Sequence, residues 1–444
     1  NKGSSRSVVL SGNVHDLFYA DNIKKYVPIT NFLTRCLTNS HHEVLIYELN
    51  GPIRCSASVR QELSAAWKSW DHPEKAKDFD HYWNACIGRP TQALEFLRQL
   101  CLMSRSNRNF NKNLIILVES SEMMLAAGNG DITSLSQTMS HRVGIVRDWI
   151  SDHDFSEAKD TLILLSESRS QIHPLVSKLP QVTNIEVPLP GLKDRTEFIK
   201  KELLSKKTET DLWDGVDGLA NLTAGLFLHS IRQLLKQDKI DVKDVLLKIE
   251  AHAQSQLGED VIEFKKPSHT LDDVIGFADL KNFIKEDFIE RFQDEKHNIS
   301  GAAVAGAIGS GKTFIFEAVA SEMGALVITL KNIRSQWFGQ TDVVFEKLRQ
   351  FIEPLHKVVI FVDEADTQFG KLGSDGHGTE KRLTGKIQAM MSDPQLKGKV
   401  LWLLMTARIE NLSADIRRPG RAGDLIIPVL DPVGKDREGF AKWA

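Results

Sequence analysis

The residues that could do chemistry begin at Gly306, where eight consecutive residues fit the pattern G-x-x-x-x-G-K-S/T in full. In such a loop the glycines let backbone N–H groups curl around a phosphate, and the following helix points its positive end at it. Lys312 would neutralise the β and γ oxygens of a nucleotide, and the Thr313 hydroxyl would hold Mg²⁺. The loop residues expected to bind the nucleotide are Gly306, Gly309, Ser310, Gly311, Lys312 and Thr313.

Two carboxylates directly follow an apolar run further along the chain. Residues 358–362 read Val-Val-Ile-Phe-Val, and Asp363 and Glu364 come next. Asp363 would lie beside the Mg²⁺ ion, and Glu364 would orient and polarise the attacking water. The alternatives are a chance glycine-rich turn and a buried strand that merely ends in a charged turn. Because the two motifs occur together and in this order, the sequence predicts a nucleotide site.

The elements that must position these residues are visible in the apolar periodicity. Residues 302–305 predict a strand before the loop, and residues 314–320 predict a helix after it. Other predicted strands alternate with helices, which indicates a parallel α/β sheet. The strands are expected at 8–10, 44–47, 114–118, 161–165, 184–187 and 326–330, and the helices at 28–37, 91–102 and 136–150.

The same order of elements occurs in both halves of the chain. Six segments match in sequence order, which argues for a duplicated module. The matches are 302–305 with 8–10, 326–330 with 44–47, 348–350 with 97–99, 358–366 with 114–122, 403–408 with 164–169, and 435–442 with 193–200.

The two copies differ where the chemistry lies. The first copy has residues 11–16, Ser-Gly-Asn-Val-His-Asp, in place of the phosphate loop. This segment has no lysine, and the carboxylate of Asp16 would repel a phosphate. Ser120 stands where the second copy has Glu364. We therefore expect the first module to keep the fold and to have lost hydrolysis.

Bulk composition sets only broad limits. The 444 residues exceed one ordinary domain, and a net charge of −3 with 41% apolar and 26% charged residues is typical of a globular protein. No apolar run approaches the roughly 18 residues that span a bilayer, and no signal peptide is recognisable, so we expect a cytoplasmic protein with reduced cysteines and no membrane partner. The first residue is Asn1 rather than Met, which fits a piece of a longer protein.

At this point the second module resembles an AAA+ ATPase of the AAA clade. Residues 272–276, Asp-Asp-Val-Ile-Gly, resemble the opening of that clade, in which Ile275 and Gly276 would hold adenine. Residues 417–424 resemble its second region of homology, whose arginines reach the γ-phosphate of a neighbouring subunit; by position these are Arg418 and Arg421. A guanidinium stabilises the charge that spreads over the phosphoryl oxygens, although solvated arginines on a loop are the alternative.

The resemblance implies ATP and Mg²⁺ as cofactors, ATP hydrolysis as the activity, and a homo-oligomeric ring, with six copies expected. It implies an α/β fold of two P-loop NTPase-type (AAA+) parallel-sheet modules, the first followed by a small helical lid. The expected domains are a degenerate AAA+ subdomain at 1–190, its helical lid at 191–257, a linker at 258–270, an active AAA+ subdomain at 271–430, and the start of a second lid at 431–444. The layout also loosely resembles the Ycf46-like ATPases.

One position departs from the AAA pattern. The clade usually has Asn at the sensor position after the fourth strand, and here Ala407 stands there. Thr406 is the candidate to replace it near the nucleotide. If it does not, hydrolysis would be slow.

The segment that follows the predicted strand 326–330 indicates what the energy of ATP is used for. Trp337, Phe338 and Gly339 resemble the pore loop with which the AAA clade grips an extended polypeptide, because aromatic side chains grip without sequence preference. The alternative is that the two aromatic side chains pack in the core or at a subunit interface.

Three functions remain open at this point. The leading hypothesis is a ring that remodels or disassembles a protein. A second is an ATP-switched assembly platform with little turnover. A third, a nucleic-acid motor or loader, rests only on the short basic segment 105–112 in a chain without net positive charge, so nucleic acid is not the expected partner.

Overall fold

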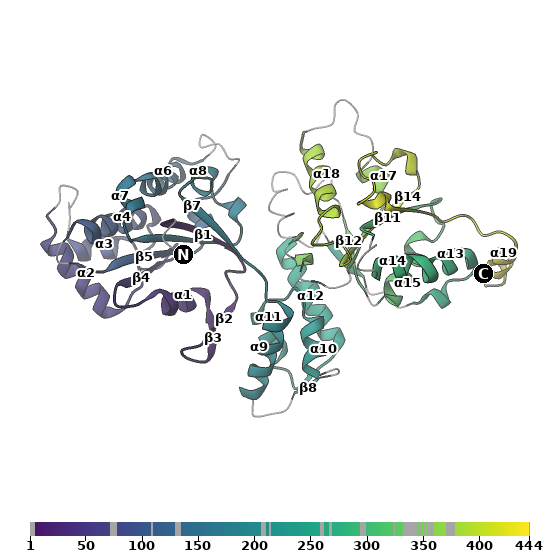
Figure 1. Ribbon diagram of the computed structural model, residues 1–444, viewed down its shortest axis with the longest axis horizontal. Coiled ribbons are helices and arrows are strands. Elements are labelled where there is room, and N and C mark those ends of the chain that lie inside the picture. Colours follow the sequence, from purple (N-terminus) through teal and green to yellow (C-terminus); the bar gives the residue numbers. More distant parts are fainter. Residues whose placement is uncertain are drawn as a thin grey trace. The chain divides into compact units, whose positions relative to one another are not determined.

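The computed structural model describes the chain apart from residues 1–4, 72–77, 108–109, 129–134, 206–209, 213–214, 258–261, 266–268, 294–298, 324, 332–344, 346–347, 350, 354, 356–357, 370–377 and 444. The chain forms two compact units (Figure 1). The first contains Asn1–Leu189 and Phe227–His229, and the second contains Pro190–Leu226 and Ser230–Ala444. Among the described helices, none combines the length and the apolar character needed to cross a bilayer.

The first unit is built on a parallel sheet of five strands. Its strands are short apolar runs rich in Val, Ile and Leu, the composition expected when both faces of a parallel sheet are buried. In spatial order they are β4 (His42–Tyr47), β5 (Asn113–Val118), β6 (Thr161–Ser166), β1 (Ser7–Gly12) and β7 (Val182–Val187).

Both faces of this sheet are covered. Alternate strand residues such as Val9 and Leu45 join a core with the helices α2 (Ala57–Ser69), α3 (Phe79–Ala85), α4 (Pro90–Ser106) and α6 (Gln137–Ser151). The other face packs on α1 (Ile29–Leu37) and on the hairpin β2 (Leu17–Ala20) and β3 (Lys25–Pro28), which Figure 1 shows together in purple. The short helices are α5 (Ser121–Met124), α7 (His153–Glu157) and α8 (Pro174–Ser177).

The second unit contains a sheet of six strands. An antiparallel edge strand, β10 (Ile262–Lys265), pairs with β12, and the other neighbours are parallel. In spatial order after β10 come β12 (Leu326–Leu330), β13 (Val358–Val362), β14 (Val400–Thr406), β11 (Gly301–Ala305) and β15 (Leu425–Pro428). If the parallel strands of each unit are numbered from 1 to 5 along the chain, both sheets have the spatial order 2-3-4-1-5.

The pairing register is also the same in the two sheets. In the first, Ser11 at the end of β1 lies opposite Ser166. In the second, Ala305 at the end of β11 lies opposite Thr406. Because a shared strand order and register place corresponding residues at corresponding edges, the predicted duplication is confirmed at the level of the fold.

The helices of the second unit fall into two sets. Around the sheet lie α13 (Ala278–Phe283), α14 (Ile289–Gln293), α15 (Lys312–Glu322), α17 (Ala365–Gln368), α18 (Gly378–Met391) and α19 (Gly434–Trp443). The segment predicted as a lid contains α9 (Leu192–Ser205), α10 (Gly215–Leu222), α11 (Leu228–Leu234) and α12 (Val242–Leu257), with the two-residue strands β8 (Asp211–Leu212) and β9 (Lys239–Ile240). The first two residues of α11, Leu228 and His229, belong to the first unit.

Most of this lid segment packs within the second unit. Gly225 there has a φ of +80°, and a Cβ placed on it would lie 3.2 Å from Leu355 Cδ2. The His252 ring, on α12, lies 6.4 Å from the Phe351 ring. The α/β class with two parallel-sheet modules is thus confirmed, and the assignment of the lid to the first module stays a prediction.

Candidate functional site

The predicted phosphate loop connects the buried strand β11 to the helix α15. Gly309 and Gly311 both have a φ of +81°, and no atom lies within 4 Å of a Cβ placed on either residue. A side chain would therefore fit in space but would strain the backbone. α15 begins at Lys312, directly after this turn. The loop and the helix N-terminus thus have the conformation that a phosphate-binding loop needs.

The donors of this loop fit a nucleotide phosphate. The Lys312 ammonium group folds over its own loop and donates to the carbonyl oxygens of Gly306 (2.8 Å) and Ala307 (2.7 Å). The Ser310 hydroxyl is buried without a hydrogen-bond partner among the described atoms. An unsatisfied buried hydroxyl beside an ammonium group is what an anionic ligand would complete. Thr313, the predicted Mg²⁺ ligand, is half-buried in the first turn of α15.

The predicted acid pair lies at the carboxyl end of β13. All five residues of that strand are buried, whereas Asp363 and Glu364 are exposed. Asp363 Oδ1 accepts a hydrogen bond from the Glu364 backbone N–H (2.9 Å). Glu364 has φ 47° and ψ 45°, the left-handed conformation, which costs a residue with a side chain about 1–2 kcal/mol. Such strain is typical of residues whose side chain must point in a fixed direction.

The hydroxyl group of Thr406, the residue before the predicted sensor position Ala407, already has two hydrogen-bond partners. Thr406, at the end of β14, is 1% exposed. Its hydroxyl donates to Asp366 Oδ1 (2.9 Å) and accepts from the Arg408 backbone N–H (3.0 Å). Thr406 therefore lies at the edge where the phosphate loop begins, but its only proton points at Asp366. The spacing of the motifs gave no sign of this pair.

Ile275 and Gly276, the predicted adenine-binding residues, lie against the last helix, α19. A Cβ placed on Gly276 would lie 3.2 Å from Asp436 Cβ and 3.2 Å from Phe440 Cε2. The Ala278 backbone N–H donates to the Asp436 carboxylate (3.3 Å). A Cβ placed on Gly439 would lie 3.7 Å from Ile275 Cγ2. Residues 275–278 and α19 thus form one packed corner of the second unit.

The two predicted arginine fingers lie on a braced segment. Asp424 accepts hydrogen bonds from the backbone N–H groups of Gly420 (2.6 Å) and Ser300 (2.9 Å), which ties the segment to the chain just before β11. Arg421 donates to Ser392 Oγ (3.0 Å) and to the Asp415 carbonyl oxygen (2.7 Å). Arg418 forms an ion pair with Asp415 (3.1 Å), and its side chain is 69% exposed.

The predicted pore loop lies outside the described residues. This applies to Trp337, Phe338 and Gly339. Their proposed role therefore rests on the sequence.

The first unit has the same backbone at the position of Glu364. Ser120 follows β5 and has φ 48° and ψ 46°, within 1° of the values for Glu364. By strand register the counterpart of Thr406 is Ser166, which corrects by one residue the sequence match of 403–408 with 164–169. Glu122 is the counterpart of Asp366. Burial raises the pKa of Glu122, and a hydrogen bond from Ser166 partly offsets that rise. The first unit thus keeps the frame of the site without its general base.

The loop after β1 is tied into its own unit. The Asp16 carboxylate accepts hydrogen bonds from the backbone N–H groups of Leu228 and His229 (2.9 Å each), at the start of α11. It also accepts from Asn13 Nδ2 (3.2 Å). Burial raises the pKa of Asp16, although these hydrogen bonds lower it in part. A buried carboxylate therefore lies in the loop of the first unit that corresponds in sequence to the phosphate loop.

A small cavity remains at the corresponding edge of the first sheet. Its volume is about 170 Å³, below the roughly 300 Å³ at which ligand pockets usually begin. It is lined by Val14, His15, Pro28, Ile29, Thr30, Glu119, Ser120, Glu122, Leu165 and Ser166.

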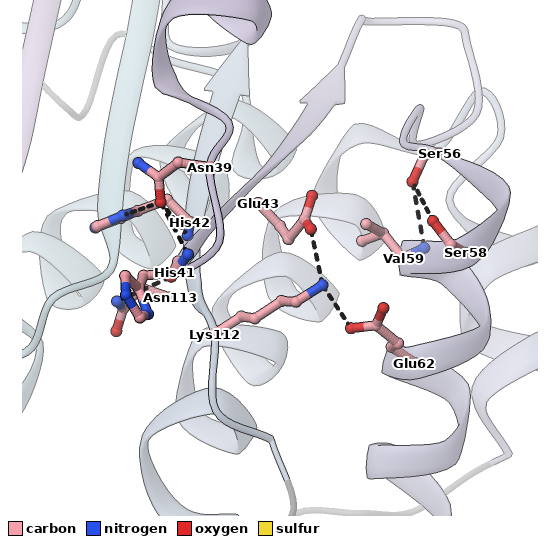
Figure 2. A network of polar contacts seen from close by, with 10 residues as sticks. All are labelled: Asn39, His41, His42, Glu43, Ser56, Ser58, Val59, Glu62, Lys112 and Asn113. Atoms are coloured by element: carbon pink, nitrogen blue, oxygen red, sulfur yellow. Dashed lines mark hydrogen bonds and ion pairs between the residues drawn. The ribbon is translucent and has the colours of Figure 1, made fainter.

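The basic segment 105–112 has its described cations paired within the first unit. Figure 2 shows Lys112 Nζ between Glu43 (2.9 Å) and Glu62 (2.8 Å). The hydrogen bonds that Lys112 donates, the one to Glu62 first and then the one to Glu43, raise its pKa. Arg105 pairs with Asp152 (3.3 Å). The local carboxylates therefore balance these cations.

Comparison with known proteins agrees with this geometry. Residues 1–188 match the family described as "AAA+ chaperone, N-terminal Rossmann-like domain". Residues 302–428 match the family described as "ATPase family associated with various cellular activities (AAA)". The chain therefore combines an AAA ATPase domain, at residues 302–428, with a preceding Rossmann-like domain of the AAA+ chaperone type, at residues 1–188.

Two relatives illustrate the range of the similarity. The chain is 21% identical over 436 residues to the "Uncharacterized AAA domain-containing protein ycf46" of Gracilaria tenuistipitata var. liui. This alignment covers 95% of this chain and 81% of that protein. It is 37% identical over 145 residues to the "ATPase family gene 2 protein homolog A" of Homo sapiens. That alignment covers 31% of this chain and 16% of that protein. The weaker similarity is thus the one that extends over both compact units.

Proposed function

We propose that this AAA+ ATPase assembles as a homo-oligomeric ring, with six copies expected, and uses ATP hydrolysis in its second unit to remodel or disassemble a protein. The observation that carries the proposal is the state of Arg418, which is 69% exposed on a segment braced by Asp424. A fixed backbone with an exposed guanidinium group suits an arginine that acts on the nucleotide of a neighbouring copy. The match of the first unit to a chaperone-type domain favours a protein as the substrate.

The roles within the site follow from the donors and acceptors present. Lys312 and the loop N–H groups bind the ATP phosphates, while Ile275 and Gly276 contact the adenine. Thr313 and Asp363 hold Mg²⁺, which supplies positive charge to the phosphate oxygens when it is bound. Glu364 takes the proton of the attacking water.

Two arginines complete the site from the adjacent copy. Arg418 and Arg421 stabilise the charge that develops on the γ-phosphoryl group. Arg421 first has to exchange its contacts with Ser392 and the Asp415 carbonyl oxygen for the phosphate. Hydrolysis therefore requires assembly.

The first unit is proposed as a non-catalytic scaffold or docking tier. It has no lysine in the loop after β1, it holds the Asp16 carboxylate at that place, and it has Ser120 in place of the general base. These three differences remove phosphate neutralisation, add repulsion, and remove the acceptor for the proton of water.

The remodelling activity is tested with an unfolded polypeptide as the probe. A permanently unfolded, carboxymethylated protein should raise the steady-state ATPase rate of the full chain several-fold. Trp337→Ala should abolish that increase and keep the basal rate, whereas Trp337→Phe should retain it because an aromatic ring remains. An equal increase in wild type and Trp337→Ala would contradict a gripping role for this loop.

A second candidate is an ATP-switched assembly platform with little turnover. The observation that favours it is Ala407 at the predicted sensor position, which has no side-chain hydrogen-bond donor or acceptor for the phosphate or the attacking water. ATP-dependent assembly without hydrolysis would distinguish this function from a motor.

A further inference from the structure

We propose that Asp366 is a positioning residue for ATP hydrolysis, which orients the Thr406 hydroxyl so that its oxygen accepts a hydrogen bond from the attacking water. The proposal rests on ATP hydrolysis in the second unit and does not depend on ring assembly or on a protein substrate. It concerns how the site works with Thr406 and Ala407 where its relatives in the AAA clade usually have an asparagine.

The first step is the position of Thr406. It is the last residue of β14, and it lies opposite Ala305, the last residue before the phosphate loop. Its carbonyl oxygen accepts a hydrogen bond from the Gly306 backbone N–H (3.2 Å). Thr406 is therefore fixed directly to the base of the loop that binds the phosphates.

The second step is the direction of the hydroxyl group. A hydroxyl has one proton and two lone pairs. The proton goes to Asp366 Oδ1 (2.9 Å), and one lone pair accepts the Arg408 backbone N–H (3.0 Å). Among the described residues this hydroxyl has no further partner, so its second lone pair is the group left to offer. Thr406 therefore acts as an acceptor, and a phosphate oxygen, itself an acceptor, is not its partner.

The third step is the proximity of the general base in the chain. Glu364 directly precedes the short helix α17 as its N-cap residue, and Asp366 is the second residue of that helix. The Asp366–Thr406 hydrogen bond thus joins the element that holds the base to the strand that borders the phosphate loop. A water that gives one proton to Glu364 has a second O–H bond, and the free lone pair of Thr406 is its acceptor.

In the first unit the corresponding hydroxyl has a backbone acceptor. Ser166 Oγ donates to the Ser168 carbonyl oxygen (2.9 Å), whereas Thr406 accepts from the Arg408 backbone N–H and gives its proton to Asp366. The unit with Ser120 in place of Glu364 thus differs from the second unit at this hydroxyl as well, which agrees with a role in hydrolysis rather than in holding the fold.

The test compares kcat with nucleotide affinity. For the full chain, Asp366→Ala should lower kcat about 10- to 100-fold, the range expected on loss of a hydrogen bond to a charged group, and should leave the Kd for a fluorescent ATP analogue within twofold. Asp366→Asn retains an acceptor oxygen and should keep kcat within about fivefold. Glu122→Ala, the matched change in the first unit, should leave kcat unchanged.

A double-variant comparison separates positioning from a structural role. Thr406→Val should reproduce the loss seen with Asp366→Ala, and the double variant should be no slower than either single variant, because both remove the same acceptor. An unchanged kcat in Asp366→Ala, a parallel loss of kcat and affinity, or additive losses in the double variant would each overturn the proposal. Should Asp366→Ala not fold, Thr406→Val, which has nearly the same volume, gives the same comparison of kcat with Kd.

Discussion

The left-handed backbone of Glu364 leads to a prediction about stability and activity together. A residue with a side chain pays about 1–2 kcal/mol in this conformation, and glycine does not. Glycine in turn loses about 0.5–1 kcal/mol more backbone entropy on folding than alanine does. The Glu364 side chain caps no backbone group and is exposed, so its removal costs little else. Glu364→Gly should therefore be about 0.5–1 kcal/mol more stable locally than Glu364→Ala, and both should be inactive.

The assay is hydrogen exchange of the backbone amides in residues 358–369, which reports the free energy of local opening. The steady-state ATPase rate is measured on the same samples. Ser120→Gly and Ser120→Ala are matched controls, because Ser120 has the same backbone angles in the first unit. Ser120→Gly should likewise be more stable than Ser120→Ala, and neither variant should change the ATPase rate. Weaker protection in Glu364→Gly than in Glu364→Ala, or activity in either, would refute the reasoning.

Three further predictions follow from single contacts. Lys312→Ala should weaken binding of an ATP analogue about 10- to 100-fold, because it removes a charge-assisted contact to phosphate, and calorimetry showing unchanged affinity would contradict the assignment of the loop. Asp16→Ala should lower the free energy of unfolding of the first unit by about 1 kcal/mol through loss of the cap on α11, which urea unfolding measures; an unchanged value would mean that the contact is not stabilising. Burial lowers the pKa of His252 to about 4, so its neutral form stabilises the fold fully above pH 6.5, and up to about 3 kcal/mol is lost as the pH falls toward 4. His252→Leu should flatten that dependence, and an equally steep fall in the variant would show that other groups cause it.

The sequence was sufficient where the signal is local. The strands predicted at 326–330 and 358–362 have the observed bounds. The helix predicted at 28–37 begins one residue before α1, and the helix predicted at 136–150 begins and ends one residue before α6. Periods of apolar residues and the phosphate-loop motif depend only on neighbours in the chain, so they are readable in one sequence.

Features that depend on distant partners were not predictable. The strand β10 lies within the segment expected to be a linker, and its place at the sheet edge is set by its pairing with β12. The hairpin of β2 and β3 was missed because four-residue strands give little alternation. The two hydrogen bonds between Asp16 and α11 join residues that are separated by 212 and 213 positions in the sequence. Asp366 and Thr406 are separated by 40 positions. Such pairs follow from the folded backbone rather than from local composition.

The roles assigned to the site residues stay predictions. The structure places Lys312, Glu364 and Thr406 at the carboxyl ends of adjacent parallel strands, where ligands bind in open α/β sheets. Their chemistry is what the experiments above address.

The central claim is that hydrolysis requires assembled copies of the chain. The direct measurement is the steady-state ATPase rate per chain against protein concentration, with oligomer size determined by light scattering on the same samples, for wild type, Glu364→Gln and Arg418→Ala. The account predicts a rate that rises with concentration as an ATP-dependent oligomer forms, no turnover in Glu364→Gln although it still assembles, and little turnover in Arg418→Ala. A rate per chain that is independent of concentration, or ATP-dependent assembly of wild type with no more turnover than Glu364→Gln, would contradict it.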